Sequence, residues 1–436
     1  MANVAFNTLG CKVNQYETES MMAQFEAKGY TIVSFHEKAD VYIVNTCTVT
    51  NMADKKSRQM LSKAKKSNGD ALVVAVGCYV QAAQETLSDV ENVDLLVGNP
   101  DKGRIVEVVE TYLESHLIPD VKDLAKYRTY DDMWLTHESG HTRVHIKIQD
   151  GCDQFCSYCI IPFARGRIRS RESESILNEV KGLVANGYKE VVLSGIHLAS
   201  YGVQFDHYAL IDLLEDLDRI EGLDRVRLGS LEPTLITEEF TKRLSQLRTI
   251  CDHFHLSMQS GDDEVLASMN RKYTTELYSK AVKHLRKIMP DCAITTDLIV
   301  GFPGESDAMF ENTLSFMASV SFSDVHVFKY SMRDGTKAAK MTNQINGSVK
   351  QERSHKAMAL TSTMHKNFLQ SLMGKTMAVL IEEKIVEDSK AYYVGHTRNY
   401  IKVYIPDGGN DLLNQVVAVI LGQTFKDGLM EKLIEI

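Results

Sequence analysis

The chain has 436 residues, of which 44% are hydrophobic and 25% charged, a composition typical of a globular protein with about two to four domains. No run of residues approaches the roughly 18 apolar positions of a membrane span, and the first residues lack a signal-peptide pattern, so we expect a cytoplasmic protein without a membrane partner. The net charge of −9 argues against a protein that wraps nucleic acid, and we expect no DNA partner, although local basic patches matter more than the sum.

Residues 1–120 predict an α/β domain. Short apolar runs bounded by turn residues predict strands at 4–6, 41–44, 72–76 and 93–97, and the stretches between and after them predict helices at 17–28, 54–66, 81–87 and 103–113. This alternation is typical of a doubly wound parallel sheet.

Three cysteines follow strands of that sheet. Cys11, Cys47 and Cys78 come after the first, second and third predicted strands. Because the carboxyl ends of parallel strands meet at one rim, we expect these thiols to converge into a three-Cys site. The alternative is three separate buried Cys, which are common in protein cores. The chain has eight Cys and no secretory signal, which favours a reducing compartment and metal binding or catalysis over disulfides.

Residues 121–142 predict a connector, and a second cysteine motif follows it. Cys152, Cys156 and Cys159 have the spacing C-x3-C-x2-C, with Tyr158 before the last thiol. Three thiolates on one short loop can hold three irons of a 4Fe–4S cluster and leave the fourth iron open to a substrate. A zinc site would need a fourth ligand nearby, and the next Cys is Cys251.

Residues 143–370 predict a partial barrel of six β/α units. Strands are expected at 144–148, 191–194, 226–229, 255–259, 294–300 and 325–330, with helices at 174–186, 208–219, 237–246, 276–288 and 307–320. The cysteine loop follows the first of these strands. Active sites of such barrels lie at the carboxyl ends of the strands, where this sequence places polar side chains.

Two groups of basic residues suggest contact with phosphate. Arg165, Arg167, Arg169 and Arg171 alternate after the cysteine loop, so an extended segment would turn all four to one side, and we expect them to bind substrate. Six basic residues also crowd the predicted helix at 54–66. For both groups the alternative is a solvated charged surface.

Residues 373–436 predict a small β-barrel. Strands are expected at 377–381, 391–394, 400–404 and 416–421, with a turn at 407–409. Such barrels often hold single-stranded nucleic acid. Here seven basic residues face nine acidic ones, so charge does not support this role, and a structural cap is the alternative.

Ordered motifs along the whole chain resemble those of the radical S-adenosylmethionine (SAM) methylthiotransferases. They are LGCKVNQYE, NTCTVTN and GC in the first domain, and GCDQFCSYCIIPFARGRIRSRE, SGIHLASYG, SMQSGDD, GFPGE and SMRDGTKAA in the second. The resemblance implies an N-terminal three-Cys domain, a radical SAM core and a C-terminal TRAM-like domain. The first and fourth motifs are most similar to the subgroup that acts on N6-threonylcarbamoyladenosine in tRNA.

The resemblance also implies cofactors and site residues. Two 4Fe–4S clusters are implied, one on Cys11, Cys47 and Cys78 and one on Cys152, Cys156 and Cys159, where SAM would be cleaved to a 5′-deoxyadenosyl radical. An electron donor such as flavodoxin or ferredoxin and the anticodon loop of tRNA are the implied partners. The implied SAM contacts are Tyr158, Gly195, Glu232, Gln259, Arg271 and Asp297, each of which could instead be an ordinary strand-end residue.

Other functions remain open from the sequence. Within the family, the substrate could be isopentenyladenosine at position 37 of tRNA or an Asp of a ribosomal protein. The first domain could bind only a structural metal, without sulfur insertion. A protein of another class would be an RNA-binding redox sensor that carries clusters without catalysing a reaction.

Overall fold

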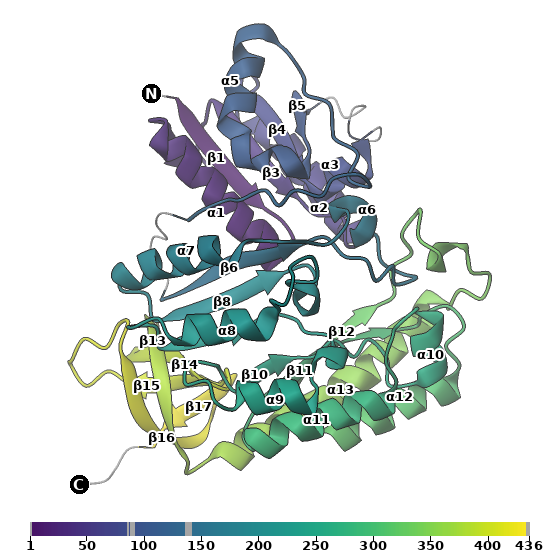
Figure 1. Ribbon diagram of the computed structural model, residues 1–436, viewed down its shortest axis with the longest axis vertical. Helices are drawn as coiled ribbons and strands as arrows, with labels where there is room; N and C mark the ends of the chain where they lie inside the picture. Colours follow the sequence, from purple (N-terminus) through teal and green to yellow (C-terminus); the bar gives the residue numbers. More distant parts are fainter. Residues whose placement is uncertain (1, 85–86, 88–91, 136–141, 433–436) are drawn as a thin grey trace.

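The computed structural model describes residues 2–84, 87, 92–135 and 142–432. Figure 1 shows three units: an N-terminal sheet with its helices at the top, a central unit of sheets and helices, and a small barrel at the lower left. None of the helices within the described residues is both long and apolar enough to cross a membrane.

The N-terminal unit is a parallel sheet of five strands. The strands are β1 (Asn3–Thr8), β2 (Thr31–Val33), β3 (Val41–Thr46), β4 (Leu72–Gly77) and β5 (Leu95–Val97), in the order β2-β1-β3-β4-β5. Every residue of β3 and β4 is buried, which explains their continuous apolar sequences. The predicted strands are therefore all present, and β2, which has no clear pattern in the sequence, forms an edge of the sheet.

Helices cover both faces of this sheet, as a doubly wound fold requires. They are α1 (Lys12–Ala27), α2 (Asn51–Ser67), α3 (Cys78–Ala82) and α5 (Ile105–Ser115). Tyr16 and Phe25 of α1 pack in one core with Ile43, whereas Leu61 of α2 packs in another core with Tyr42. Neighbouring residues of β3 thus face opposite layers. The helix predicted at 81–87 overlaps residues 85–86, which lie outside the described residues.

The central unit is an incomplete barrel. Its parallel strands are β6 (Arg143–Asp150), β8 (Glu190–Gly195), β9 (Arg225–Leu228), β10 (His253–His255), β11 (Ala293–Val300) and β12 (Asp324–Lys329), with the short antiparallel β7 (Arg169–Ser170) on the outer edge of β6. Single bridges, Val226 to Ile250 and Leu231 to Leu256, join the two sheets that contain β9 and β10. Six strands are present in the predicted chain order, although the fourth, predicted at 255–259, is the shorter β10, which overlaps the predicted range only at His255.

Eight helices follow or separate these strands in the described part of the chain. They are α6 (Ile161–Arg165), α7 (Ser173–Ala185), α8 (Leu210–Asp218), α9 (Glu238–Leu244), α10 (Asp263–Ser268), α11 (Thr275–Ile288), α12 (Asp307–Val320) and α13 (Gly347–Leu372). One core continues from the N-terminal sheet into the barrel, since Val4 and Val144 belong to the same cluster of buried side chains. The two α/β units therefore pack as one body.

The C-terminal unit is a closed barrel of five strands. These are β13 (Thr376–Glu387), β14 (Lys390–Thr397), β15 (Lys402–Pro406), β16 (Val416–Phe425) and β17 (Gly428–Glu431). The predicted small β-barrel is confirmed. Arg225 and Arg227 of β9 donate hydrogen bonds to backbone carbonyls of Ala378, His396 and Arg398 at 2.9 Å, which fixes the small barrel to the amino end of the central strands.

The predicted domain boundaries can be placed on these elements. The described part of the predicted connector, residues 121–135, contains neither helix nor strand, and residues 136–141 lie outside the described residues. The predicted end of the core at residue 370 falls inside α13, which ends at Leu372.

Candidate functional site

The three N-terminal cysteines lie at the carboxyl ends of adjacent strands. Cys11 precedes α1 after β1, Cys47 follows β3, and Cys78 begins α3 after β4, and β1, β3 and β4 are neighbours in the sheet. The pKa of the Cys47 thiol is raised to about 11, chiefly by burial, and the thiols of Cys78 and Cys11 contribute to this rise. Burial also raises the pKa of the Cys11 thiol, against the lowering effect of Arg165, and the Cys78 thiol adds to the rise. The three thiols are thus close enough to sense one another's charge.

A glycine allows this close approach. Gly10 has a φ of 105°, and a Cβ atom at this position would lie 2.8 Å from Sγ of Cys47. Any other residue before Cys11 would therefore push Cys47 away and strain the backbone. The glycine in the motif LGCK has a direct role in bringing two of the three thiols together.

The second cysteine loop is held firmly at the mouth of the barrel. The backbone N–H of Cys152 donates to the carbonyl of Gly166 at 3.0 Å, and Ser157 donates through its backbone to Met269 and through its hydroxyl to Ser268. Burial raises the pKa of Cys152 to about 11 and that of Cys159 to about 12. Binding of iron must therefore overcome the cost of forming buried thiolates.

One arginine points at a thiol in each set. Nε of Arg165 donates to Sγ of Cys78 at 3.1 Å, and a terminal guanidinium nitrogen of Arg271 donates to Sγ of Cys156 at 3.2 Å. Arg165 is completely buried, and the side chain of Arg271 is 7% exposed. A buried cation that donates to sulfur favours the thiolate form. The sequence motifs predicted this role for neither arginine.

The number and kind of donors suit iron–sulfur clusters. A 4Fe–4S cluster spreads three thiolates over three irons, whereas zinc needs its ligands around one centre. Two sets of three thiols, each beside a buried arginine, are therefore suited to 4Fe–4S clusters. Cys251 and Cys292 are buried and belong to neither set.

The six predicted SAM contacts lie around the mouth of the barrel, and two pairs of them are in contact. Glu232 lies 3.8 Å from the Arg271 guanidinium and 2.6 Å from Nε2 of His197. The backbone N–H of Gln259, at a φ of 65°, donates to the carbonyl of Asp297 at 2.9 Å. Gly195 ends β8, and Tyr158 packs against a separate buried cluster that includes Phe302. Their contact with SAM stays a prediction.

The prediction that four arginines line one substrate-binding surface is wrong for three of them. Arg165, Arg169 and Arg171 are buried, whereas the side chain of Arg167 is 43% exposed and pairs with Asp153. The segment is not a continuous strand, because α6 ends at Arg165 and Gly166 has a φ of 75°.

Each of the three buried arginines meets a carboxylate. Arg165 pairs with Glu17, Arg169 lies 3.4 Å from Asp150, and Arg171 pairs with Glu179. Their positive charges are neutralised inside the protein by these carboxylates, at the contact between the two α/β units.

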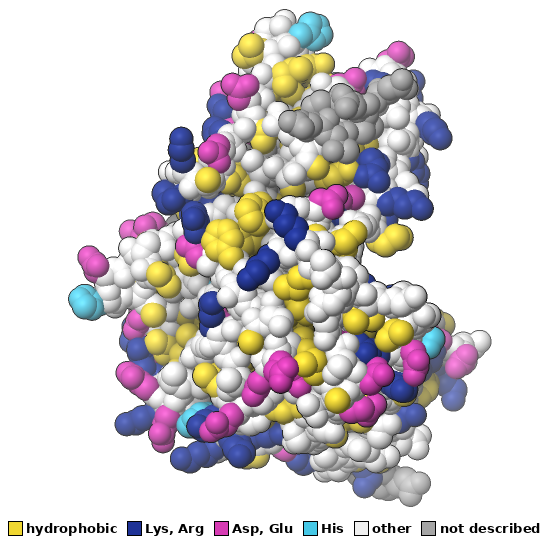
Figure 2. Space-filling model, turned by 90° about the vertical axis from the view of Figure 1, so that its right-hand side faces the viewer, with side chains coloured by type: hydrophobic (Ala, Val, Ile, Leu, Met, Phe, Trp, Pro, Cys, Tyr) yellow, Lys and Arg dark blue, Asp and Glu magenta, His cyan; other side chains and the backbone are white. Residues whose placement is uncertain are grey.

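A cavity of about 570 Å³ lies beside cysteines of both sets, although no Cys is among its lining residues. Its lining is drawn from the residues that follow Cys47, Cys78 and Cys159, together with a loop of the barrel: Thr48, Asn51, Asp54, Tyr79, Gln81, Ala82, Ala83, Gln84, Ile160, Arg333 and Asp334. Figure 2 shows a hollow between the upper and lower parts of the molecule. The cavity is large enough for a nucleoside-sized ligand.

Arg333 connects the two sides of this cavity. Its guanidinium donates to Thr48 at 2.7 Å, to Asn51 at 2.6 Å and to Asp54 at 2.7 Å. The sequence motif SMRDGTKAA contains this arginine, but nothing in the motif alone shows which residues it meets.

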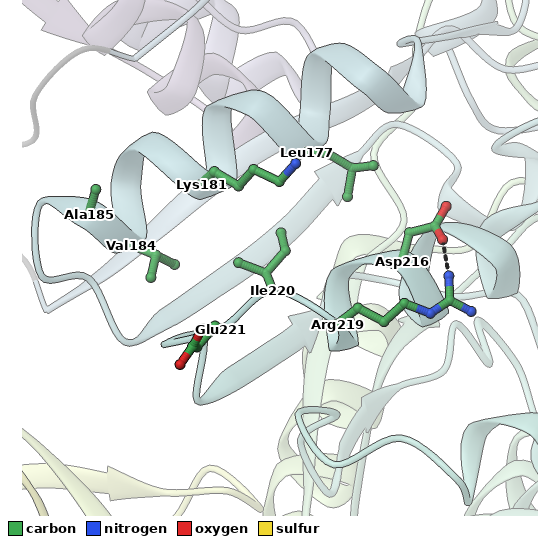
Figure 3. A pocket seen from close by; sticks show the side chains of 8 residues that line it. All are labelled: Leu177, Lys181, Val184, Ala185, Asp216, Arg219, Ile220 and Glu221. Carbon is green, nitrogen blue, oxygen red and sulfur yellow. Dashed lines mark hydrogen bonds and ion pairs between the residues drawn. The ribbon is translucent and has the colours of Figure 1, made fainter.

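A second depression lies on the outer surface and has no link to the thiols. Figure 3 shows its lining residues on and around α7 and α8, where Arg219 pairs with Asp216. It has a volume of about 630 Å³. Its lining residues lead into the amino ends of β8 and β9, whereas the cysteine loops follow the carboxyl ends of their strands, so it takes no part in the chemistry of the thiols.

Comparison with known proteins agrees with this geometry. Residues 146–317 match the family described as "Radical SAM superfamily", and residues 3–98 match "Uncharacterized protein family UPF0004". Among solved structures, the radical SAM methyltransferase TsrM from Kitasatospora setae has a TM-score of 0.56 at 17% identity, over 75% of this chain and 73% of that one. This likeness shows a radical SAM fold.

Relatives of known name extend the match to the whole chain. The threonylcarbamoyladenosine tRNA methylthiotransferase MtaB of Bacillus subtilis (strain 168) is 40% identical over 100% of this chain and 98% of its own length. MtaB of Aquifex aeolicus is 38% identical over 92% of this chain and 96% of its own length. The tRNA-2-methylthio-N(6)-dimethylallyladenosine synthase of Alkaliphilus oremlandii is 35% identical over 94% of this chain and 88% of its own length. The chain therefore belongs to the family of radical SAM tRNA methylthiotransferases.

Proposed function

We propose that this protein adds a methylthio group to carbon 2 of N6-threonylcarbamoyladenosine at position 37 of tRNA. The observation that carries the proposal is the pair of three-thiol sets, one in each α/β unit, with neighbours of both sets lining one cavity. The relatives named for threonylcarbamoyladenosine are 35–40% identical to this chain, and those named for dimethylallyladenosine are 33–35% identical.

Two sets of thiols match a reaction that needs both a radical and a sulfur atom. The aromatic C–H bond at carbon 2 has no pKa that a side-chain base could reach near neutral pH, so acid–base catalysis alone is insufficient. When bound, the cluster on the loop of Cys152 with SAM supplies a radical, and the cluster on the set of Cys11 supplies sulfur. A redox sensor would need no cavity beside its two sets of thiols.

The residues of the chain hold, orient and shield these groups. The six Cys would bind the clusters, and Arg165 and Arg271 would stabilise one thiolate of each set. The anticodon loop of tRNA is single-stranded, so a base at position 37 can turn into the cavity without opening a duplex. An electron donor such as flavodoxin or ferredoxin would supply the electron that cleaves SAM. We place the enzyme in the cytoplasm, since tRNA is modified there.

Two matched triple variants test the proposal in anaerobically reconstituted protein. We expect that each variant, one with Cys152, Cys156 and Cys159 changed to Ala and one with Cys11, Cys47 and Cys78 changed to Ala, keeps about half of the iron. The first should form no 5′-deoxyadenosine. The second should still cleave some SAM but yield no methylthio product, because the radical is formed in the other unit. Methylthio product from the second variant would contradict the proposed role of the N-terminal set.

A further inference from the structure

Helix α2 carries a stripe of basic residues on its outer face. Lys55, Arg58, Lys63 and Lys66 follow one another at intervals of three to five residues, while Ser57, Leu61 and Ala64 are buried on the opposite face. The stripe extends over about 16 Å of the helix. A shallow groove of about 600 Å³ runs along it, lined by Lys55, Arg58, Gln59, Ser62, Lys63 and Lys66, and contains no acidic residue.

The charges of this groove are not neutralised by the rest of the described chain. Asp54, the one acidic residue of α2, turns to Arg333, and Lys65, on another face of the helix, pairs with Asp94. Among the described residues, the four cations of the stripe form no ion pair with a carboxylate. Within the described residues, a protein with a net charge of −9 thus carries a basic surface without paired carboxylates at one place on its N-terminal unit.

The groove lies next to the cavity that is lined by neighbours of both sets of cysteines. Arg58 donates to the hydroxyl of Tyr79, and Tyr79 lines that cavity. Asn51 and Asp54 in the first turn of α2 also line it, so the helix leads from the cavity to the groove. In Figure 2, Lys and Arg side chains lie on the upper part of the molecule, near the hollow.

We propose that this groove binds the phosphate backbone of the RNA whose nucleotide enters the cavity; the inference rests on the proposed function. Lysines on flexible side chains act as point charges for phosphates. The groove offers mainly cationic donors and no aromatic ring, so it suits contact with the backbone rather than recognition of bases. Release of counterions from the RNA would then supply much of the affinity.

A charge-removal variant of the reconstituted enzyme tests the inference. In the first variant, Lys55, Lys63 and Lys66 are changed to Ala, and Arg58 is kept because it bonds to Tyr79. The control changes Lys280, Lys283 and Lys287 to Ala, three exposed lysines of α11 on the outer side of the barrel. The dissociation constant for threonylcarbamoylated tRNA is measured at several salt concentrations, together with SAM cleavage without RNA.

We expect the α2 variant to bind tRNA at least about tenfold more weakly at low salt. The slope of log K against log salt should become smaller by roughly two, since each lost phosphate contact removes about 0.7–0.9. The α11 control should match the unchanged protein in affinity and slope, and all three should cleave SAM equally without RNA.

The possible failures are distinguishable. If the α2 variant and the α11 control gave the same affinity and slope while the unchanged enzyme methylthiolated tRNA, the inference would be wrong and the proposed function would stand. If the unchanged enzyme bound tRNA through these lysines but gave no methylthio product, the groove would be supported and the proposed function would fail.

Discussion

Two buried arginines donate hydrogen bonds to the thiols, one in each set. Arg165 donates to Cys78 and also bonds to Asn14 and Glu17, while Arg271 donates to Cys156 and lies near Glu232. Each arginine is thus fixed by protein groups, and each gives one thiolate of its set a buried, charged hydrogen-bond donor. Such bonds are stronger than neutral ones.

We expect the change Arg165→Gln to lower the reduction potential of the N-terminal cluster. Reduction adds negative charge, and loss of the buried cation destabilises the reduced form more than the oxidised form. The hydrogen bond to a charged group is worth about 1.5 kcal/mol or more, which corresponds to roughly 60 mV for one electron.

The potential is measured by a redox titration of the variant in a background without Cys152, Cys156 and Cys159, so that only one cluster is present. Arg165→Lys, which keeps the charge, is the control and should recover much of the potential. Equal potentials for the Gln variant and the unchanged residue would refute this role of Arg165.

At the level of elements, the turn between β6 and the cysteine loop depends on one glycine. Gly151 has a φ of 72°, and a Cβ atom there would lie 1.8 Å from the carbonyl oxygen of Arg167. The backbone of the segment after α6 therefore lies directly against the start of the loop that carries Cys152. Only glycine permits this contact.

The change Gly151→Ala should lower the midpoint of thermal unfolding by roughly 5 °C or more, because it adds a backbone clash to the cost of a left-handed conformation. Gly187→Ala is the matched control. Gly187 also has a positive φ, 91°, but a Cβ atom there would meet nothing within 4 Å. Equal shifts for both variants in scanning calorimetry would show that the close contact has no importance.

The elements that were predictable from sequence are those with a strong local pattern. β3 and β4 are buried throughout, so their runs of apolar residues mark central parallel strands. Helix α13 was not predicted, because its buried face includes Arg353, Ser354 and Thr361 and gives little apolar periodicity. The three-residue β2 is too short to form a clear pattern.

The candidate site was predictable only in part, for a related reason. Cysteines after parallel strands meet at one rim whatever the details of packing, so Cys11, Cys47 and Cys78 could be grouped from sequence. The environment of Arg165 depends on Glu17, which lies 148 residues away in sequence. The alternation of Arg165, Arg167, Arg169 and Arg171 in the sequence could not reveal that partner. It predicted one exposed row of four arginines, which the structure does not contain.

At the scale of the whole molecule, the two α/β units are joined through buried charges. Glu17 of the N-terminal unit lies 2.6 Å from Lys102 and 2.7 Å from Lys147 of β6, which in turn lies 2.7 Å from Asp150. Removal of one partner from such a network leaves an uncompensated buried charge. The network and the contacts of Arg333 with Thr48, Asn51 and Asp54 fix the two units, and so their two sets of thiols, relative to each other.

The central claim is that the methylthio group is added to threonylcarbamoyladenosine in tRNA, and one measurement tests it directly. Reconstituted enzyme, SAM and reductant are incubated in parallel with threonylcarbamoylated tRNA, isopentenylated tRNA and the ribosomal protein, and digestion with mass analysis locates any methylthio group. We predict the group on carbon 2 of threonylcarbamoyladenosine 37 and on neither other substrate. Methylthiolation of only the isopentenylated tRNA, or of only the protein, would contradict the account.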